Sequence, residues 1–166
     1  MATKARKPQA ARKKERATRS AKPAGNGTRT ANKGAYKGGS GGRYVYDLYD
    51  LKRIAAGAQG GYADTRAVVI EGENVQVGLA FEKRGCGSEP HTHPNEQFNF
   101  IVKGTFTVDV GAKKGMRAPT GSLVYFPANV VHRSVATPDE DAIFFVVKDL
   151  SHGITGTAVA KKSRRR

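Results

Sequence analysis

The sequence predicts a single all-β domain, a sandwich or barrel, on the basis of three observations. Short apolar stretches, separated by Gly, Pro and Asn, follow one another through most of residues 65–150. Several of them alternate apolar and polar residues, which is the period of a β-strand, and helical periodicity is almost absent. The length of 166 residues leaves room for one ordinary domain with tails.

The folded part is expected to begin at Arg43, with strand-like alternation over residues 44–48 and a short helix or turn over residues 51–58. A Gly/Asn turn at residues 71–74 favours a hairpin between the strands on either side of it. The expected strands cover residues 67–70, 75–81, 98–102, 105–110, 123–126, 130–135 and 143–147, with a Gly/Lys hairpin at residues 111–115. Phe106, Val108, Phe126, Ile143 and Phe145 are expected to form core and pocket wall.

The positive charge belongs to the two ends of the chain. Of the net charge of +15, residues 1–42 contribute +11 and residues 161–166 contribute +5, which leaves −1 for the body between them. The body is therefore nearly neutral, and the basic composition does not indicate a fold that binds nucleic acid.

Residues 1–42 contain no Leu, Ile, Val or Phe, so they cannot bury enough apolar area to offset the entropy of ordering them. Residues 25–42 have the composition of a flexible linker. We therefore expect a disordered basic tail and linker over residues 1–42, a folded domain over residues 43–158 and a basic tail over residues 159–166.

The tails favour weak, salt-sensitive and sequence-independent contact with nucleic acid, or alternatively a purely solubilising role. Stacking on single strands is disfavoured, because residues 1–35 contain no aromatic side chain. The single cysteine, Cys86, suits a reducing compartment, and no apolar run approaches the roughly 18 residues of a membrane span. We expect a cytoplasmic protein.

Histidines form the candidate functional site. Strand alternation places His91 and His93 on one face, where both imidazoles can reach one cation, and Gln97 keeps their parity. Glu96 has the opposite parity, although a bulge at Pro94 would reverse the two. The alternation of side chains along the strand therefore favours Gln97 over Glu96 as a further ligand, and both alternatives stay open.

A third imidazole, His132, belongs to a later strand. Three imidazoles with one oxygen donor suit Fe(II), Mn, Ni, Zn or Cu at a catalytic site rather than a structural one. Asn99 shares the inward parity of Gln97, so we expect its amide to bind a ligand, a substrate or neighbouring backbone.

The spacing around these histidines resembles the first motif of the cupin family. That motif is a Gly, five residues, His-x-His, three or four residues, Glu, six residues and a Gly. Gly85, His91, His93, Gln97 and Gly104 reproduce these spacings, with Gln97 in the position of the Glu.

The second cupin motif, a Gly, five residues, Pro-x-Gly, two residues, His, three residues and an Asn, is also matched. Gly121, Pro127, Asn129, His132 and Ala136 occupy its positions. Asn129 replaces a Gly, and Asn is the commonest non-Gly residue in the left-handed conformation that such a turn needs. Ala136 replaces the final Asn.

The resemblance covers roughly residues 65–150 and implies a small single-domain cupin, a jelly-roll (double-stranded β-helix) barrel. It implies metal binding by His91, His93, Gln97 and His132, with proton handling or orientation by Glu96 or Asn99. Because Gln97 is neutral, the metal site would keep a charge of +2, which favours an anionic and chelating small molecule as substrate.

Dioxygenase chemistry is the favoured activity, with isomerase or lyase chemistry as alternatives. A non-catalytic module that binds a metal or small molecule, and a protein that associates with nucleic acid through its tails, are the other hypotheses. We also expect a homodimer.

Overall fold

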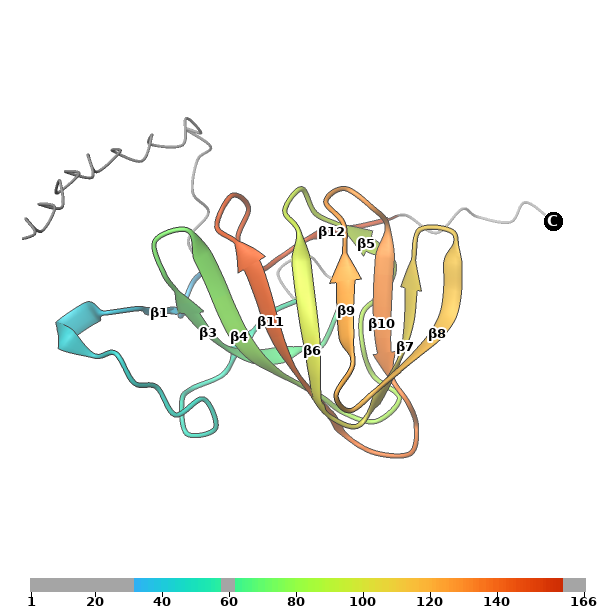
Figure 1. The fold of residues 1–166 in the computed structure, drawn as a ribbon, viewed down its shortest axis with the longest axis horizontal. Helices are drawn as coiled ribbons and strands as arrows, with labels where there is room; N and C mark the ends of the chain where they lie inside the picture. Colours follow the sequence, from blue (N-terminus) through green and yellow to red (C-terminus); the bar gives the residue numbers. More distant parts are fainter. Residues whose placement is uncertain (1–31, 58–61, 160–166) are drawn as a thin grey trace, which may run out of the picture.

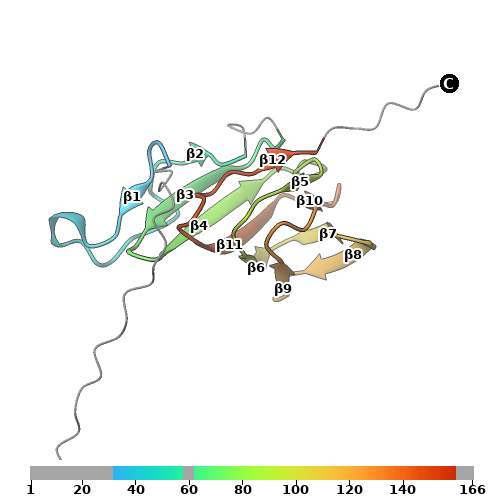
Figure 2. The same cartoon turned by 90° about the horizontal axis from the view of Figure 1, so that it is seen from above.

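The structure is a computed structural model of the chain, and it describes residues 32–57 and 62–159. The strands form two β-sheets; most of them stand side by side across the view of Figure 1, and Figure 2 shows the same strands from above. In chain order, the elements are β1 (Tyr36–Lys37), η1 (Ser40–Gly42, a 3-10 turn), β2 (Ile54–Ala55), β3 (Arg66–Glu71), β4 (Val75–Glu82), β5 (His91–Thr92), β6 (Gln97–Lys103), β7 (Thr105–Val110), β8 (Lys113–Pro119), β9 (Leu123–Phe126), β10 (His132–Ala136), β11 (Ala142–Asp149) and β12 (Thr157–Ala158).

The larger sheet has the order β1-β3-β4-β11-β6-β9, with β2 paired to the outside of β3. The smaller sheet has the order β12-β5-β10-β7-β8. Among the described strands only the β1–β3 pair is parallel, and the chain crosses repeatedly between the sheets. The result is the all-β jelly-roll barrel that the sequence predicted.

The core lies between the two sheets because each inner strand turns alternate side chains inward. On β11, Phe144 and Val146 are buried, and Phe144 meets Phe106 of the opposite sheet edge to face, with ring centroids 5.5 Å apart. Ala67 and Ala80 are small enough to leave room beside them. Burial of these apolar side chains stabilises the barrel, and each large one contributes roughly 1.5–3 kcal/mol.

Three local expectations differ from the structure. Residues 44–48 form no strand. Residues 51–57 contain the strand β2 and bends, where a short helix or turn was expected over residues 51–58, of which residue 58 lies outside the described residues. Residues 113–119 form the strand β8 rather than part of a hairpin loop. The strand was missed because six of its seven residues are exposed, so no apolar alternation marks it.

Asn32 and β1, which lie in the expected linker, pack on the barrel. The side-chain amide of Asn32 donates hydrogen bonds to Glu71 Oε1 (2.9 Å) and Gln76 Oε1 (2.7 Å), and its Oδ1 accepts one from the backbone N–H of Ile154 (3.0 Å). These polar contacts carry no apolar signal, so composition alone assigned them to the linker. Residues 1–31 and 160–166, which include most of the basic tails, lie outside the described residues.

Asn129 has a φ of 62°, so the turn before β10 uses the left-handed conformation that its sequence favoured. The turn determines where β10 begins and therefore where its first residue, His132, lies. Within the described parts of the chain we find no helix with the length and hydropathy of a membrane span.

Candidate metal centre

The barrel brings the three predicted histidines together near one end of the smaller sheet. His91 opens β5 and His132 opens β10, and the two residues are direct partners in the antiparallel pair β5–β10. Directly opposed residues have Cβ atoms about 4.5–5.5 Å apart, so pairing alone juxtaposes these two imidazoles. His93 follows β5, and its carbonyl accepts a hydrogen bond from the Asn129 N–H (2.8 Å), which links the two histidine segments.

One ring nitrogen from each of the three imidazoles lies within 4.8 Å of the other two. The ring centroids are 4.3 Å apart for His91 and His132, and 4.7 Å apart for His93 and His132. All three residues are buried, with His93 and His132 each only 2% exposed. A single ion could be held by this group.

The outer ring nitrogens are already bonded to the backbone. Nδ1 of His91 contacts the carbonyl of Glu89 (2.9 Å), Nδ1 of His93 that of Asn95 (2.8 Å), and Nδ1 of His132 that of Val130 (2.8 Å). A carbonyl oxygen can only accept, so each Nδ1 carries the proton and each neutral ring presents the lone pair of Nε2.

Nε2 of His93 and of His132 are buried without a hydrogen-bond partner. A buried polar atom without a partner costs roughly 1–3 kcal/mol unless something binds it. A metal-binding histidine usually donates the N–H of its other ring nitrogen to a group such as a backbone carbonyl, and this hydrogen bond fixes the tautomer. The residues present therefore fit a divalent transition metal.

Burial keeps these histidines neutral. Desolvation, helped by the nearby charges of His132 and Lys148, lowers the pKa of His91 to about 4. The same causes, with desolvation again the largest, lower the pKa of His93 to about 3, and burial also lowers the pKa of His132. A metal therefore does not compete with protons for these rings near neutral pH.

Gln97 and Asn99 both lie on the inner face of β6, as their parity predicted, and both line the same cavity as His91 and His132. The amide nitrogen of Gln97 donates a hydrogen bond to Oδ1 of Asn99 (2.8 Å). That bond turns the Gln97 nitrogen toward Asn99 and leaves Oε1 as the donor atom that Gln97 can offer a ligand.

Glu96 lies elsewhere. Its side chain is exposed and accepts a hydrogen bond from the hydroxyl of Tyr125 (2.6 Å), which is on the outer surface of β9. The alternation of side chains is thus not reversed at Pro94. Glu96 belongs neither to the histidine group nor to the cavity lining.

The cavity beside the histidines has a volume of about 50 Å³. A buried site needs roughly 10–15 Å³ to hold one water, so this space suits about four waters or a ligand of similar size. Its walls are formed by Ala56, Gly57, Tyr62, Ala63, Thr65, Ala67, Ala80, Glu82, Ser88, His91, Gln97, Asn99, Phe126, His132, Ser134, Phe144, Val146 and Ile154.

Three further polar residues near the histidines were not predicted from the sequence. Tyr62 is buried and stacks on His91, with centroids 4.0 Å apart and an angle of 16° between the rings. Burial raises the pKa of Tyr62 to about 12, against a smaller opposing effect of the Gly156 backbone. Tyr62 therefore acts as a neutral wall that fixes the orientation of the His91 ring.

Glu82 is the carboxyl group of the cavity. It is 6% exposed, lies on β4, and accepts a hydrogen bond from the hydroxyl of Thr65. Burial raises the pKa of Glu82, and the nearby Asp64 carboxylate also raises it, while the bond to Thr65 acts in the opposite direction. Such a group holds a proton more readily than an exposed glutamate does.

Lys148 brings a buried positive charge close to the histidines. It is 3% exposed, and its ammonium group donates a hydrogen bond to the carbonyl of Ile154 (3.1 Å). Burial lowers the pKa of Lys148 to about 7, although the Asp149 carboxylate partly opposes this. The Lys148 charge in turn helps to lower the pKa of all three histidines.

The segment after β11 closes this end of the site. The buried amide of Asn95 donates hydrogen bonds to the carbonyls of Asp149 (3.0 Å) and Gly153 (3.1 Å). Gly156 packs so tightly that a Cβ atom there would lie 3.0 Å from Cδ2 of His91. Residues 149–158 therefore hold the histidine rings from outside.

A larger surface groove of about 660 Å³ lies on the other side of Glu82. Its lining includes Arg53, Lys103 and Cys86, but none of the three histidines. His91 and His132 therefore border the smaller cavity and not this groove. The sole thiol, Cys86, is separate from the smaller cavity.

Comparison with protein families gives a match to the cupin domain over residues 79–148. That range includes the three histidines and both motifs that surround them. The protein has a small cupin-superfamily domain. In cupins, clustered histidines of this kind hold a metal, and the triad described here could do the same.

Solved structures agree with this fold. A polyketide cyclase, RemF from Streptomyces resistomycificus, is 14% identical with a TM-score of 0.60, over 72% of this chain and 87% of its own. An RmlC-like cupin from Shewanella frigidimarina is 17% identical with a TM-score of 0.55, over 65% of this chain and 91% of its own.

The cupin domain of Cnp3 from Schizosaccharomyces pombe is 13% identical with a TM-score of 0.54, over 64% of this chain and 73% of its own. Identities this low show a shared fold and nothing about activity. The comparison with curated proteins gave no match.

Proposed function

We propose that this cupin holds a divalent transition metal through His91, His93, His132 and Gln97, and acts on a small anionic molecule in the adjoining cavity. The observation that carries the proposal is the orientation of the histidines. Backbone carbonyls occupy every Nδ1, and Nε2 of His93 and of His132 is buried with no partner. Fe(II), Mn, Ni, Zn and Cu all accept such a donor set.

Electrostatics support an anionic substrate. The Glu96 carboxylate lies outside the cavity, so the four proposed ligands are neutral and leave the ion its charge of +2. Lys148, whose pKa burial lowers to about 7, adds positive charge nearby when it is protonated, and Glu82 keeps its proton more readily because burial raises its pKa. A small carboxylate, enolate or α-keto acid would lower the net charge of this site, and the roughly 50 Å³ of free space suits a molecule of that size.

When bound, the metal would supply Lewis-acid polarisation and a template for the substrate. Asn99, held by Gln97, would orient the substrate from β6. Glu82 lines the same cavity and would donate a proton to the substrate or receive one from it. Tyr62 on the His91 face and Phe126 on the His132 face would exclude water.

The neutral donor set resembles the three-histidine centres of some cupin dioxygenases, so we propose dioxygenase activity first and isomerase or lyase activity as alternatives. Metal content is the first test. Protein purified from metal-supplemented medium should contain close to one transition metal per chain, and the double variant His91→Ala/His132→Ala should contain almost none. Glu96→Ala is the matched control and should keep its metal; equal metal in wild type and double variant would refute the site.

Oxygen uptake then separates the activities. Wild-type protein loaded with Fe(II) is expected to consume oxygen with a member of a panel of small carboxylates, enols and α-keto acids, and the double variant is not. Product formation without oxygen uptake would favour isomerase or lyase chemistry. Metal and ligand binding without any turnover would identify a non-catalytic binding module.

A further inference from the structure

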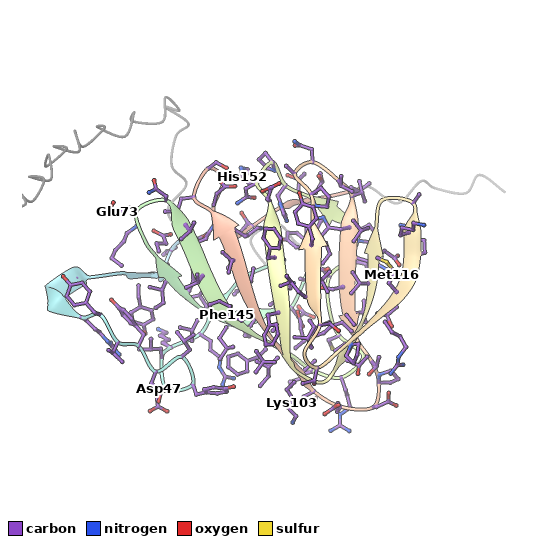
Figure 3. All side chains as sticks on the ribbon, in the orientation of Figure 1. Asp47, Glu73, Lys103, Met116, Phe145 and His152 are labelled. Carbon is purple, nitrogen blue, oxygen red and sulfur yellow. The ribbon has the colours of Figure 1, made fainter. Side chains whose placement is uncertain are left out.

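The surface groove of about 660 Å³ beside Glu82 has no part in the proposed function. Four of the residues that line it are basic: Arg53, Arg66, Lys83 and Lys103. We call this space the basic groove. It lies at one end of the larger sheet, and in Figure 3 Lys103 is labelled at that end, below Phe145.

A row of register partners across the larger sheet forms the floor of the basic groove. Arg66 on β3 is the partner of Phe81 on β4. Ile143 on β11 is the partner both of Phe81 and of Lys103 on β6. Two half-buried apolar side chains therefore lie between two exposed cations. Neighbouring strands are about 4.8 Å apart, so the Cα atoms of Arg66 and Lys103 are separated by roughly 14 Å.

The position of Ile143 differs from the sequence expectation. Ile143 and Phe145 were expected to form core and pocket wall, but β11 is apolar on both faces, so alternation could not show which face is inside. Phe144 and Val146 are the buried pair, whereas Ile143 and Phe145 are half-buried on the outer face. Ile143 lines the basic groove and not the cavity beside the histidines.

Arg53 is held in place above this floor. Its guanidinium group lies over the ring of Phe81, 3.5 Å from the centroid, and Tyr49 packs edge-on against the same ring with centroids 6.1 Å apart. A guanidinium group can bind a carboxylate through two hydrogen bonds and can also stack on a planar group. Because Phe81 already restricts the Arg53 side chain, less conformational freedom is lost when a ligand binds there.

None of the four basic side chains of the groove has a carboxylate partner within ion-pair distance among the described residues. The ion pairs in that part of the chain involve other cations, namely Lys37, Arg84, Lys114 and Arg133. A cleft lined by charges of one sign raises the local concentration of the opposite ion. The basic groove should therefore attract anions.

Acidic residues reduce the positive charge of the groove without cancelling it. Asp64 and Asp141 line it, and Asp141 also accepts a hydrogen bond from the backbone N–H of Arg84 (3.0 Å). The third acidic residue is Glu82, whose pKa is raised by burial. With Glu82 protonated, four basic residues against two carboxylates leave an excess of two positive charges, although residues 43–160 as a whole carry −1.

The dimensions of the groove favour a small molecule over a protein partner. Ligand sites usually have volumes of about 300–1,000 Å³, and the basic groove falls within that range. Twelve residues line it, whereas an ordinary protein interface takes about 20–30 residues from each partner. The excess of two positive charges matches two carboxylates; two phosphate groups would bring about 3–4 negative charges.

We propose that the basic groove binds a small aromatic dicarboxylate, with its planar body against Phe81 and Ile143 and one carboxylate at each end of the floor. Arg66 would bind one carboxylate and Lys103 the other. Arg53 would stack on the planar body. Such a molecule is too large for the cavity of about 50 Å³ beside the histidines, so the proposal does not depend on the metal centre.

Titration calorimetry of the full chain with naphthalene-2,6-dicarboxylate, at low ionic strength, tests the groove. We expect one site per chain with a dissociation constant below about 1 mM. Naphthalene-2-carboxylate lacks one of the two charged groups and should bind about tenfold more weakly. Added salt should weaken the binding of the dicarboxylate more than that of the monocarboxylate, because more exposed charge pairs are screened.

Charge reversal at either end of the floor locates the site. Arg66→Glu and Lys103→Glu should each weaken binding of the dicarboxylate at least about tenfold. Lys113→Glu is the matched control: it changes the net charge equally, at an exposed lysine on β8 of the smaller sheet, and should leave the dissociation constant within about twofold of wild type. Circular dichroism and the thermal midpoint check that each variant is folded. Arg66→Gln or Lys103→Gln replaces a variant that is not, with an expected weakening of about threefold.

Cys86 provides a second readout inside the groove. It is the sole cysteine of the chain, it is half-buried, and it lines the groove. Dicarboxylate at ten times its dissociation constant should slow the reaction of Cys86 with uncharged iodoacetamide at least about fivefold in wild-type protein. The same ligand concentration should slow it less than about twofold in Arg66→Glu.

A dissociation constant above about 1 mM for wild-type protein overturns the proposal. So does weakening by Lys113→Glu that equals the weakening by Arg66→Glu and Lys103→Glu. Binding that leaves the reaction of Cys86 unchanged overturns it as well, because the dicarboxylate would then be held elsewhere on the chain. The double variant His91→Ala/His132→Ala should bind the dicarboxylate as wild type does, so failure of this proposal and failure of the metal centre are distinguishable.

Discussion

His93→Gln in metal-free protein should remove a large part of the acid sensitivity of the fold. Glutamine keeps a polar side chain of similar reach but cannot be protonated. Burial lowers the pKa of His93 to about 3 in the folded protein, whereas an unfolded histidine has a pKa of about 6.5. Below pH 6.5 the unfolded chain therefore binds a proton at this position that the folded chain does not, and stability falls as pH falls.

The magnitude follows from the two pKa values. A pH of 5 lies about 1.5 units below the pKa of the unfolded imidazole, so the unfolded imidazole is protonated, while the folded one is still neutral. Each unit corresponds to about 1.4 kcal/mol, so His93 should account for about 2 kcal/mol of the stability lost between pH 7 and pH 5. Water in the adjoining cavity screens the charge and would reduce this value toward 1 kcal/mol.

Urea denaturation with a chelator present, at pH 7 and at pH 5, measures the effect. The difference in unfolding free energy between the two pH values should be smaller in His93→Gln than in wild type by about 1–2 kcal/mol. Leu123→Gln, on the outer sheet face and far from any titrating group of the cavity, should keep the wild-type difference. Equal pH dependence in His93→Gln and wild type would refute a buried neutral His93.

Three other substitutions probe the surroundings of the histidines. Gly156→Ala should lower metal affinity about tenfold, because its Cβ would lie 2.9 Å from the Thr92 carbonyl oxygen and 3.0 Å from Cδ2 of His91, so that β5 or the ring must shift. Titration calorimetry measures the affinity, and an unchanged value would contradict the close packing. Lys148→Met should raise metal affinity several-fold, because it removes a nearby positive charge, and it should weaken the binding of small carboxylates to the metal-loaded protein. Calorimetry measures both affinities. Glu82→Gln should raise the thermal midpoint more at pH 8 than at pH 5. Burial raises the pKa of Glu82, so its ionisation destabilises the fold as pH rises. An equal rise of the midpoint at both pH values would argue against a buried carboxyl group.

The strands and the histidine cluster could be predicted because each has a periodic or spaced signal. Parity alone placed Gln97 and Asn99 on the inner face of β6 and Glu96 on the outer one. The spacing of Gly, Pro and Asn around His91 and His132 grouped the two histidines, whereas their direct pairing on β5 and β10 is known only from the structure.

Other features left no such signal. Tyr62 reaches His91 from a segment without strand alternation, and Lys148 is a lysine whose burial shows only in its shared parity with Phe144 and Val146. Asn32 belongs to a stretch whose composition is that of a linker, yet it bonds across the barrel to Gln76. Contacts of single polar groups between distant parts of the chain depend on the tertiary fold and cannot be deduced from local pattern.

The closing segment after β11 has a consequence for biosynthesis. A chain emerges from the ribosome N-terminus first, so His91, His93 and His132 are all available before residues 149–158, which brace them, have been made. The pairing of β12 with β5 and the bonds from Asn95 can form only when translation has passed this point. We therefore expect nascent chains interrupted near Leu150 to carry every proposed metal ligand and yet lack one wall of the site, so that tight metal binding would require residues 149–158 as well.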